Sequence, residues 1–450
     1  MTNSPATPNA ITLRRIFATW WPLAASWLLM SLEMPALSIV VARLSDPEIH
    51  LAAYGGVVFP LALIIEAPII MLLAASTALS KDWASYSLVR RYMNAAGASL
   101  TLLHLLVAFT PLYDLVVRGL LGAPAEIVEP ARTGLQIMLP WTWTIAYRRF
   151  NQGVLIRTGR SRAVGLGTFV RLVANVSVLI IGYLARLPGI VVASSAVATG
   201  VTTEAIYVSL VIRPVLNSEI KPAPPVQPAL TWSAFWAFYI PLVMTSLLSL
   251  IANPIGSAAI SRMPEALASL AVWPVLTGLI FMLRSLGIAY NEVVVALLDR
   301  PGSAPGLWRF SLYMSAATTL ALLLIAATPL SHFWFGDVSA LPPHLVELAQ
   351  AGIWLALPLP ALSVLQSWYQ GAILYGRRTN GITESVVIYL LTSAVILVGG
   401  VVWGGLSGLL VGLLAITASV ATQTSWLWWR ARPVLAGLRE AGEEKVSIAS

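Results

Sequence analysis

The chain has 450 residues, of which 58% are hydrophobic and only 10% are charged, and its mean hydropathy is +0.81. A soluble domain carries about 25% charged residues, so this composition excludes an ordinary soluble protein and predicts a polytopic membrane protein. The absence of cysteine excludes disulfides, thiolate metal sites and cysteine nucleophiles. The net charge of +8 is spread over many short loops, which is typical of membrane topology and not of nucleic-acid binding.

The first apolar run extends from Ile16 to Val41, directly after the basic pair Arg14-Arg15. It is too long for a cleaved signal peptide and has no clear small-residue cleavage site, so we expect an uncleaved first span. Further runs of roughly 20 apolar residues follow along the chain. They predict twelve spans in two sets of six, at about 16–41, 52–77, 92–112, 135–156, 164–184 and 190–211, and then at about 232–260, 268–298, 308–329, 352–375, 382–403 and 406–429.

The segment 213–230 separates the two sets of spans and contains the proline-rich stretch RPVLNSEIKPAPPVQP. This composition predicts a solvated cytoplasmic linker. We therefore expect an N-lobe at 1–212, a C-lobe at 231–433 and a cytoplasmic tail at 434–450. The predicted fold class is an all-α polytopic membrane protein with twelve transmembrane helices in two homologous six-helix lobes.

The two sets of spans repeat one another at an offset of 219 residues, which becomes 218 after one deletion. Chance identity between hydrophobic segments usually involves Leu, Ala and Val, whereas here Pro, Gly, Glu and Gln recur in register. The matches include Pro35 with Pro254, Arg43 with Arg262, and Gln152 with Gln370. Because each set has six spans, both halves share one orientation and form a parallel repeat about an axis along the membrane normal.

The distribution of the 27 Lys and Arg residues predicts the topology. Five of them lie in the loops after the odd-numbered spans, and four lie inside spans. The other 18 lie in the N-terminal segment, in the loops after the even-numbered spans and in the tail. By the positive-inside rule both termini are cytoplasmic. We expect a multi-pass protein of a bacterial-type inner or plasma membrane.

Ionisable residues inside the spans are the candidates for a transport path, because each costs about 2.5–3.5 kcal/mol on the insertion scale. They are Glu33 in span 1, Glu66 in span 2, Arg148 and Arg149 in span 4, Arg171 in span 5 and Arg284 in span 8. Arg171 lies nearer the cytoplasmic end of its span, where its side chain could reach the interface.

Neutral polar residues accompany these charges. Asn151 and Gln152 lie on the same helical face as Arg148, and span 10 repeats this spacing with Gln366 and Gln370. Asn253 precedes a proline in span 7, where backbone carbonyls can open toward a cavity. We expect these residues to bind the substrate together with Arg148, Arg149 and Arg284.

Two interpretations of the buried charges stay open. In the structural one, Glu33 or Glu66 neutralises Arg148 or Arg149 in a pair that locks the N-lobe. In the functional one, an excess of arginine receives an anionic substrate, because a guanidinium forks onto carboxylate or phosphate oxygens. Glu33 and Glu66 would then carry a coupling proton or ion, since substrate and carboxylate compete for the same arginines.

Several short motifs support a resemblance. Each half has a Pro-Leu pair in its first span, at Pro22-Leu23 and Pro241-Leu242, and spans 4 and 10 end with Gln-Gly and a basic turn (Gln152-Gly153 and Gln370-Gly371, followed by Arg377-Arg378). In these features the chain resembles the multidrug/oligosaccharidyl-lipid/polysaccharide exporter superfamily. Through Glu33, Ser80-Lys81-Asp82 and Leu298-Asp299-Arg300 it is also similar to the progressive ankylosis group within that superfamily.

The resemblance implies a MATE-like, V-shaped pair of lobes that works by alternating access. It implies a central cavity lined by spans 1, 2, 7 and 8, with help from spans 4, 5 and 10. Multidrug and toxin exporters often couple cations through an acid in the first helix, and Glu33 is the position that corresponds. Arg148, Arg149 and Arg284 fit the branches that handle anionic or pyrophosphate-bearing cargo, which argues against an organic cation.

We therefore predict a secondary active exporter of an anionic or phosphate-bearing small molecule, coupled to H⁺ or Na⁺, with no other cofactor and no metal site. The alternatives are a proton- or sodium-coupled multidrug antiporter and a lipid-linked polysaccharide flippase. A membrane-embedded enzyme is disfavoured, because no Walker motif, metal-ligand cluster or Ser-His-Asp arrangement stands in the sequence. We expect a monomer whose partners are its substrate and the lipid bilayer.

Overall fold

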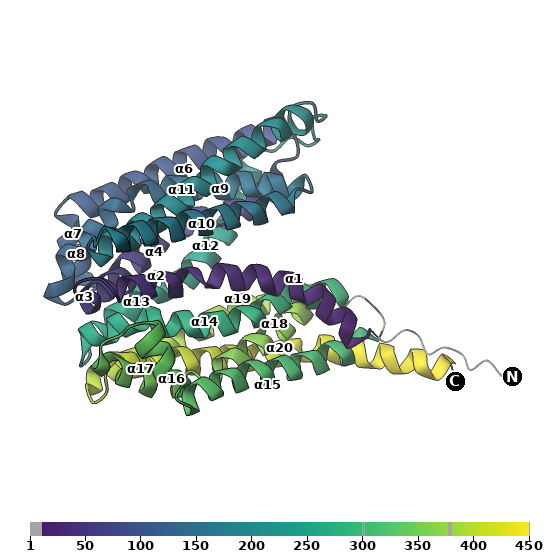
Figure 1. Ribbon diagram of the computed structural model, residues 1–450. Coiled ribbons are helices and arrows are strands. Elements are labelled where there is room, and N and C mark those ends of the chain that lie inside the picture. Colours follow the sequence, from purple (N-terminus) through teal and green to yellow (C-terminus); the bar gives the residue numbers. More distant parts are fainter. Residues whose placement is uncertain (1–10, 299, 301, 377–379, 450) are drawn as a thin grey trace.

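The computed structural model describes residues 11–298, 300, 302–376 and 380–449, and every regular element in those ranges is a helix (Figure 1). Asp299 of the Leu298-Asp299-Arg300 motif, the Arg377-Arg378 turn and the first ten residues lie outside the described ranges.

The first half of the chain contains six membrane-crossing segments. Span 1 consists of α1 (Leu13–Ser31) and α2 (Glu33–Val41), and span 2 consists of α3 (Pro47–Ala53), the π-helix η1 (Tyr54–Val58), α4 (Phe59–Ile70) and α5 (Leu72–Leu79). Span 3 is α6 (Trp83–Phe109), and the short elements α7 (Leu112–Asp114), η2 (Leu115–Leu120) and α8 (Ala125–Ile137) connect it to span 4, which is α9 (Leu139–Arg157). Span 5 is α10 (Ser161–Leu184), and span 6 is α11 (Gly189–Val215), which η3 (Leu216–Ile220) continues.

The second half repeats this order with fewer breaks. Span 7 consists of α12 (Trp232–Leu250) and α13 (Ala252–Ile260), span 8 is α14 (Ala266–Leu297), and span 9 is α15 (Ser303–Ala327). The short elements α16 (Leu330–His332), η4 (Phe333–Val338) and α17 (Pro343–Leu355) connect span 9 to span 10, which is α18 (Leu359–Tyr375). Span 11 is α19 (Asn380–Trp403), and span 12 is α20 (Gly408–Ala449). The predicted two sets of six helical spans are confirmed in the described part of the chain.

Span 4 differs from the others in composition. By length and hydropathy alone, eleven of the described segments could cross a membrane, and α9 is the one left out. It falls short because Arg148, Arg149 and Arg157 lower its hydropathy. The chain therefore inserts this helix at an energetic cost that the rest of the structure must offset.

Spans 1 and 7 are both broken at a repeat-related proline. A proline lacks the backbone N–H and its ring clashes with the carbonyl four residues earlier, which interrupts a helix. Accordingly α1 ends at Ser31, four residues before Pro35, and α12 ends at Leu250, four residues before Pro254. Each break lets the two parts of its span pack against different neighbours.

These first spans connect the two lobes. The ribbons form two groups, with α6, α9, α10 and α11 in one and α14, α15, α18 and α20 in the other (Figure 1). The helix α1 packs on α14 of the second group, whereas α12 packs on α4 of the first. Trp20 Nε1 donates to the Leu286 carbonyl at 3.0 Å, and the hydroxyl of Tyr239 donates to the Pro68 carbonyl at 2.7 Å. In each half, the first part of the first span therefore packs against helices of the other half.

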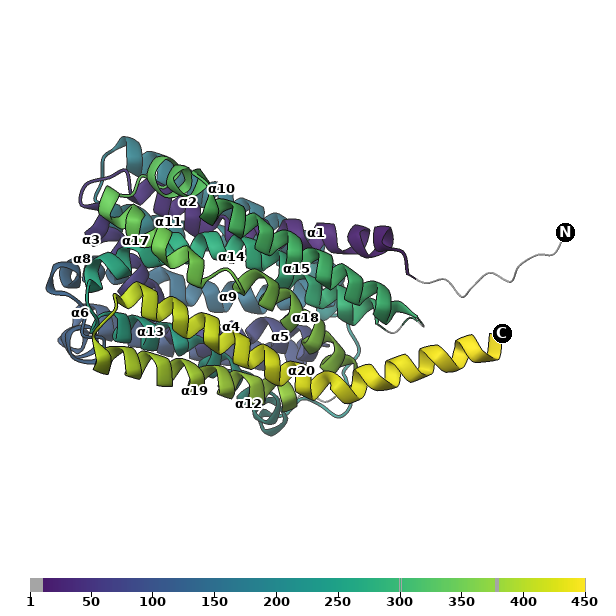
Figure 2. The same cartoon turned by 90° about the horizontal axis from the view of Figure 1, so that it is seen from below.

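Two predicted boundaries differ from the structure. The linker was expected from residue 213, but α11 and η3 remain helical to Ile220, so the irregular connection starts later. The segment 434–450, which the sequence assigns to a cytoplasmic tail, begins within α20, because this helix continues through Pro433 to Ala449. The first described turns of α1 and the end of α20 lie at the same end of the molecule (Figure 2).

Candidate functional site

A network of buried ion pairs links spans 1, 4, 5 and 6 of the N-lobe. Arg148 Nη1 on α9 donates to Glu204 Oε2 on α11 at 2.5 Å, and Gln152 Nε2 donates to Glu204 Oε1 at 2.8 Å. Arg171 of α10 bridges two acids, with Nε 3.6 Å from Glu204 Oε2 and Nη2 3.2 Å from Glu33 Oε2. We call Glu33, Arg148, Gln152, Arg171 and Glu204 the N-lobe ion network.

Helix packing explains why these charges can meet. Gly200 lies one turn before Glu204, and a Cβ there would stand 3.2 Å from both Cγ and the carbonyl oxygen of Arg171. A larger residue would therefore push α10 away from α11. Asn175 completes the arrangement, because its Nδ2 donates to Glu33 Oε1 at 2.8 Å. Inside the membrane these hydrogen bonds replace the water that the charges give up.

Glu66 and Arg149 form a second, looser set of charges beside the network. Glu66 of α4 is buried, with an exposed fraction of 3%. Its Oε2 atom and the Nε atom of Arg149 have no hydrogen-bond partner among the described residues. No ion pair within 4 Å joins Glu66 to Arg148 or Arg149. The free carboxylate oxygen of Glu66 could accept a proton or bind a cation or a water molecule, and the free N–H of Arg149 could donate a hydrogen bond to water.

Arg284 lies in the C-lobe, at a cavity of about 380 Å³. Its Nε donates to the hydroxyl of Ser363 at 2.8 Å, and no carboxylate of the described residues lies within 4 Å of it. Arg284 is half-buried and belongs to the lining of the cavity. The walls are mainly apolar and come from spans 1, 2, 7, 8, 10, 11 and 12, with Phe59, Trp273 and Phe281 as large members and Asn253, Tyr389 and Ser393 as polar ones.

A second cavity, of about 250 Å³, lies between spans 1, 8 and 10 and is lined by polar groups. Gln366 and Gln370 line it together with Asn291. Gln366 Nε2 also donates to Gln423 Oε1 at 2.9 Å, and Asn291 Nδ2 donates to the Ser367 carbonyl at 3.3 Å. Ser363 borders this cavity and holds Arg284 of the first one, so the two cavities adjoin at that pair.

The structure separates the predicted site residues into two places. Arg148, Arg149, Gln152, Glu33 and Glu66 lie in the N-lobe, whereas Arg284, Asn253, Gln366 and Gln370 border the two C-lobe cavities. Asn151 is buried on α9 and donates to the carbonyl of Tyr147 at 2.9 Å. The lining of the larger cavity includes spans 11 and 12, which were not expected, and no residue of spans 4 and 5.

Sequence reasoning missed Glu204, and this changes the balance of buried charge. The expected partner of Arg148 was Glu33 or Glu66, but the observed partner is Glu204, which is fully buried. The same rule that selects the other intramembrane acids would have found it, since it lies within the apolar run 190–211. With Glu204 counted, three acids (Glu33, Glu66 and Glu204) and three arginines (Arg148, Arg149 and Arg171) lie inside the spans of the N-lobe.

Among the described residues, no group of three or more His, Cys, Asp or Glu side chains is placed to hold a metal ion.

Comparison with known proteins gives matches in structure alone. No family model matches the sequence, and no curated protein matches it. An inward-facing multidrug resistance transporter of the MATE family superimposes with a TM-score of 0.67 at 15% identity, over 93% of this chain and 99% of that one. The lipid II flippase MurJ, in an inward closed conformation, matches with a TM-score of 0.61 at 14% identity, over 91% and 89%.

A transporter of the same superfamily from Pyrococcus furiosus matches with a TM-score of 0.57 at 15% identity, over 95% of this chain and 97% of that one. Its structure is described by a binding pocket of reverse polarity that suggests a different function. These matches span nearly all of every chain compared. The protein has a MATE-like fold, with twelve helical spans in two lobes in the part of the chain that the structure describes.

Proposed function

We propose that the protein is a secondary active transporter that binds an anionic, partly apolar substrate in the C-lobe cavity at Arg284. The observation that carries this proposal is the position of the uncompensated charge. In the N-lobe, Arg148 and Arg171 form ion pairs with Glu204 and Glu33, and Arg149 lies in the same lobe as the buried Glu66, whereas Arg284 borders a cavity with no carboxylate within 4 Å of it among the described residues. A permanently charged guanidinium in such a place is stabilised when an anion binds to it.

The dimensions and chemistry of the cavity fit this role. Its volume of about 380 Å³ falls in the range of small-molecule sites, which is about 300–1,000 Å³. Trp273 and Phe281 offer apolar surface, while Asn253 and Tyr389 offer hydrogen bonds beside the arginine. The substrate class that suits these walls is an organic carboxylate or phosphate with an apolar body. The Pyrococcus protein supports the idea that pocket polarity varies on this fold.

This proposal narrows the expected binding role of the arginines. Arg148 is held by Glu204 and Gln152 in the N-lobe core, so we assign it to structure and coupling and not to direct substrate contact. Arg149 and Glu66 each have a polar atom without a hydrogen-bond partner among the described residues, so we assign proton or ion coupling to Glu66. Glu33 remains a second candidate for coupling, because it is the member of the N-lobe ion network nearest the break in span 1. Export across an inner or plasma membrane by a monomer remains part of the proposal.

Substrate counterflow in proteoliposomes tests the substrate. The panel holds citrate, pyrophosphate, a nucleotide, an alkyl phosphate and a cationic dye, and we expect uptake of an anionic member only. Arg284→Gln should weaken that uptake by roughly 10- to 100-fold, because a hydrogen bond to a charged group contributes about 1.5–3 kcal/mol. Arg91→Gln, at an exposed arginine of α6, should leave uptake unchanged. Uptake of the dye by the wild-type protein, or uptake of the anion by Arg284→Gln at the wild-type rate, would disprove the anion site.

The coupling role is tested separately. In the same vesicles, wild-type counterflow should depend on pH, whereas Glu66→Gln should remove that dependence and retain exchange. Glu66→Gln with an unaltered pH profile would exclude Glu66 from coupling without affecting the assignment of Arg284.

A further inference from the structure

Two repeat-related arginines bridge the lobes at the end of the molecule opposite the described ends of α1 and α20. Arg43 follows α2, and Arg262 follows α13 at the equivalent position of the second half. Arg43 Nη1 donates to the carbonyl of Ile39 at 2.7 Å, and Arg262 Nη1 donates to that of Ala258 at 2.6 Å. Each arginine is therefore anchored to the carbonyl four residues earlier in its own half.

The other terminal nitrogen of each arginine reaches the opposite half. Arg43 Nη2 donates to the carbonyl of Asp337 at 2.9 Å, in the π-helix η4. Arg262 Nη2 contacts the carbonyls of Leu120 and Gly119 at 2.8 and 3.4 Å, in the π-helix η2, and its Nη1 reaches that of Leu121 at 2.9 Å. The two acceptor helices are also repeat mates, so one contact is built twice, once in each direction.

The acceptors have the right chemistry for a guanidinium. The last carbonyls of a helix have no partner within the helix and carry partial negative charge, so a cation placed there is stabilised. Gly122 follows η2 with a φ of 65°, and a Cβ at this position would lie 3.1 Å from Cζ of Arg262. The turn thus leaves space for the arginine of the other half.

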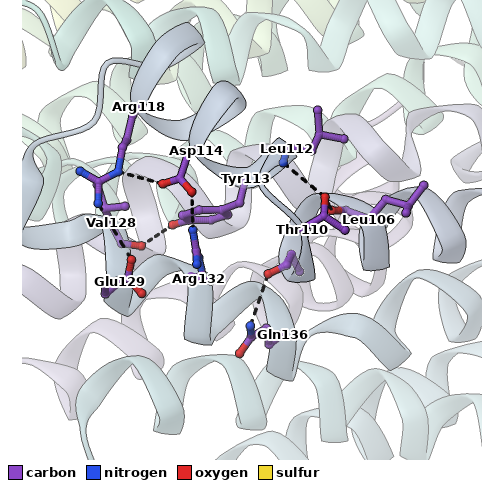
Figure 3. A network of polar contacts seen from close by, with 11 residues as sticks. Leu106, Thr110, Leu112, Tyr113, Asp114, Arg118, Val128, Glu129, Arg132 and Gln136 are labelled. Atoms are coloured by element: carbon purple, nitrogen blue, oxygen red, sulfur yellow. Dashed lines mark hydrogen bonds and ion pairs between the residues drawn. The ribbon is translucent and has the colours of Figure 1, made fainter.

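The helix η2 is held firmly within the N-lobe (Figure 3). Arg118 Nε donates to Asp114 Oδ1 at 2.9 Å, and Arg132 Nη2 donates to Asp114 Oδ2 at 2.7 Å. The hydroxyl of Tyr113 donates to the carbonyl of Val128, and Arg132 stands over the Tyr113 ring at 4.5 Å. Because α7, which runs directly into η2, is joined to α8 by these contacts, Arg262 connects the second half of the chain to several helices of the N-lobe.

We propose that Arg43 and Arg262 form a paired latch that holds the two lobes closed at this end and must release for the transporter to open there. Both arginines are exposed, so each bridge is weak enough to break during a transport cycle. A two-state equilibrium responds to such small differences, because about 1.4 kcal/mol changes a population ratio tenfold. The latch favours the conformation in which this end is shut. The free-energy contributions of Arg43 and Arg262 add, because the two arginines lie at separate contacts.

The absence of cysteine in the chain permits a direct test by spin labelling of the full-length protein. Leu184 and Val402 are repeat mates at the ends of α10 and α19 nearest the latch, with exposed fractions of 73% and 82%. Electron–electron resonance between labels at Leu184→Cys and Val402→Cys reports the separation of the lobes at this end. A second pair, Arg91→Cys and Arg309→Cys, lies on exposed positions near the starts of α6 and α15 and reports the opposite end.

We expect Arg262→Gln to raise the ratio of long to short distances for the first pair by about tenfold, and Arg43→Gln to raise it by about threefold, because Arg262 reaches three carbonyls across the lobes and Arg43 reaches one. The double variant should multiply the two effects. The second pair should shorten as the first lengthens. Arg118→Gln is the matched control, since it removes an arginine of η2 that bonds only within the N-lobe.

Three results would overturn the latch. One is a double variant with the wild-type distance distribution. Another is a shift of the same size in Arg118→Gln. The third is lengthening of both label pairs together, which would mean general loosening of the fold instead of release at one end.

Discussion

Replacement of Glu204 by Gln should destabilise the protein more than any single change at a surface ion pair. Glu204 is fully buried and accepts hydrogen bonds from Arg148 and Gln152 while lying 3.6 Å from Arg171. Loss of its charge leaves two arginines short of a partner inside the membrane. Removal of one member of a buried pair costs about 3–5 kcal/mol, because the remaining charge stays desolvated.

The chain provides a control of the same chemistry and distance. Arg160 Nη1 lies 2.5 Å from Glu219 Oε1, as close as Arg148 lies to Glu204, but both of its side chains are 40% exposed. Exposed ion pairs contribute about 0–1 kcal/mol. Glu219→Gln should therefore cost at least about 2 kcal/mol less than Glu204→Gln, although the two pairs look alike when only the distance is considered.

The assay is unfolding in bicelles by titration with sodium dodecyl sulfate, followed by the fluorescence of the 17 tryptophans. Arg148→Met should cost less than Glu204→Gln, because Glu204 keeps Gln152 and Arg171. The double variant should be more stable than the sum of the single effects predicts, by about 1–3 kcal/mol. Equal costs for the variants at Glu204 and Glu219, or strict additivity in the double variant, would refute the reasoning from burial.

Two further predictions concern packing and pH. A Cβ at Gly153 would lie 1.8 Å from Ser76 Oγ, so Gly153→Ala should lower the free energy of unfolding by about 1–3 kcal/mol through overpacking. A Cβ at Gly165 would meet nothing within 4 Å, so Gly165→Ala should be neutral or stabilising by about 0.5–1 kcal/mol. Equal unfolding midpoints for the two variants in the detergent titration would contradict this prediction. Burial alone would raise the pKa of Asp82, but hydrogen bonds from Ser85 and from the Val226 N–H of the linker together lower it. Since the folded pKa lies below the unfolded value, the stabilisation by Asp82 is present at neutral pH and disappears as the pH falls below about 4. The stability gap between wild type and Asp82→Asn should be about 1 kcal/mol at pH 7, because a hydrogen bond to a charged group is stronger than one to a neutral group. The gap should close at about pH 4, and a gap that is constant with pH would be contrary evidence.

The fold could be predicted from the sequence because its determinants are local or repeated. Apolar runs of membrane length give the spans, and repeated positions such as Pro35 and Pro254 show that one six-helix unit occurs twice. The exact ends of the helices could not be predicted. Neither polar composition nor a proline ends the last helix, because α20 continues through Pro433 to Ala449.

The candidate site was less predictable, because its geometry depends on which helices meet. The sequence indicates that Arg148, Arg284 and Glu33 are costly within the membrane, but not which of them share a neighbour. The packing of α10 against α11 decides that Glu204 is the partner of Arg148. In the C-lobe, the packing of spans 11 and 12 beside span 8 places Arg284 at a cavity and not beside an acid.

The exchange of α1 and α12 between the lobes has a consequence for how this chain could be divided or recombined. A cut in the linker would release two pieces, each of which carries a helix that finds its neighbours on the other piece. Neither piece is a self-sufficient module, and a hybrid with a foreign second half would need to match two docking surfaces at once. In evolution, a gene duplication followed by this exchange would tie the two copies together and require later changes in one to be accommodated by the other.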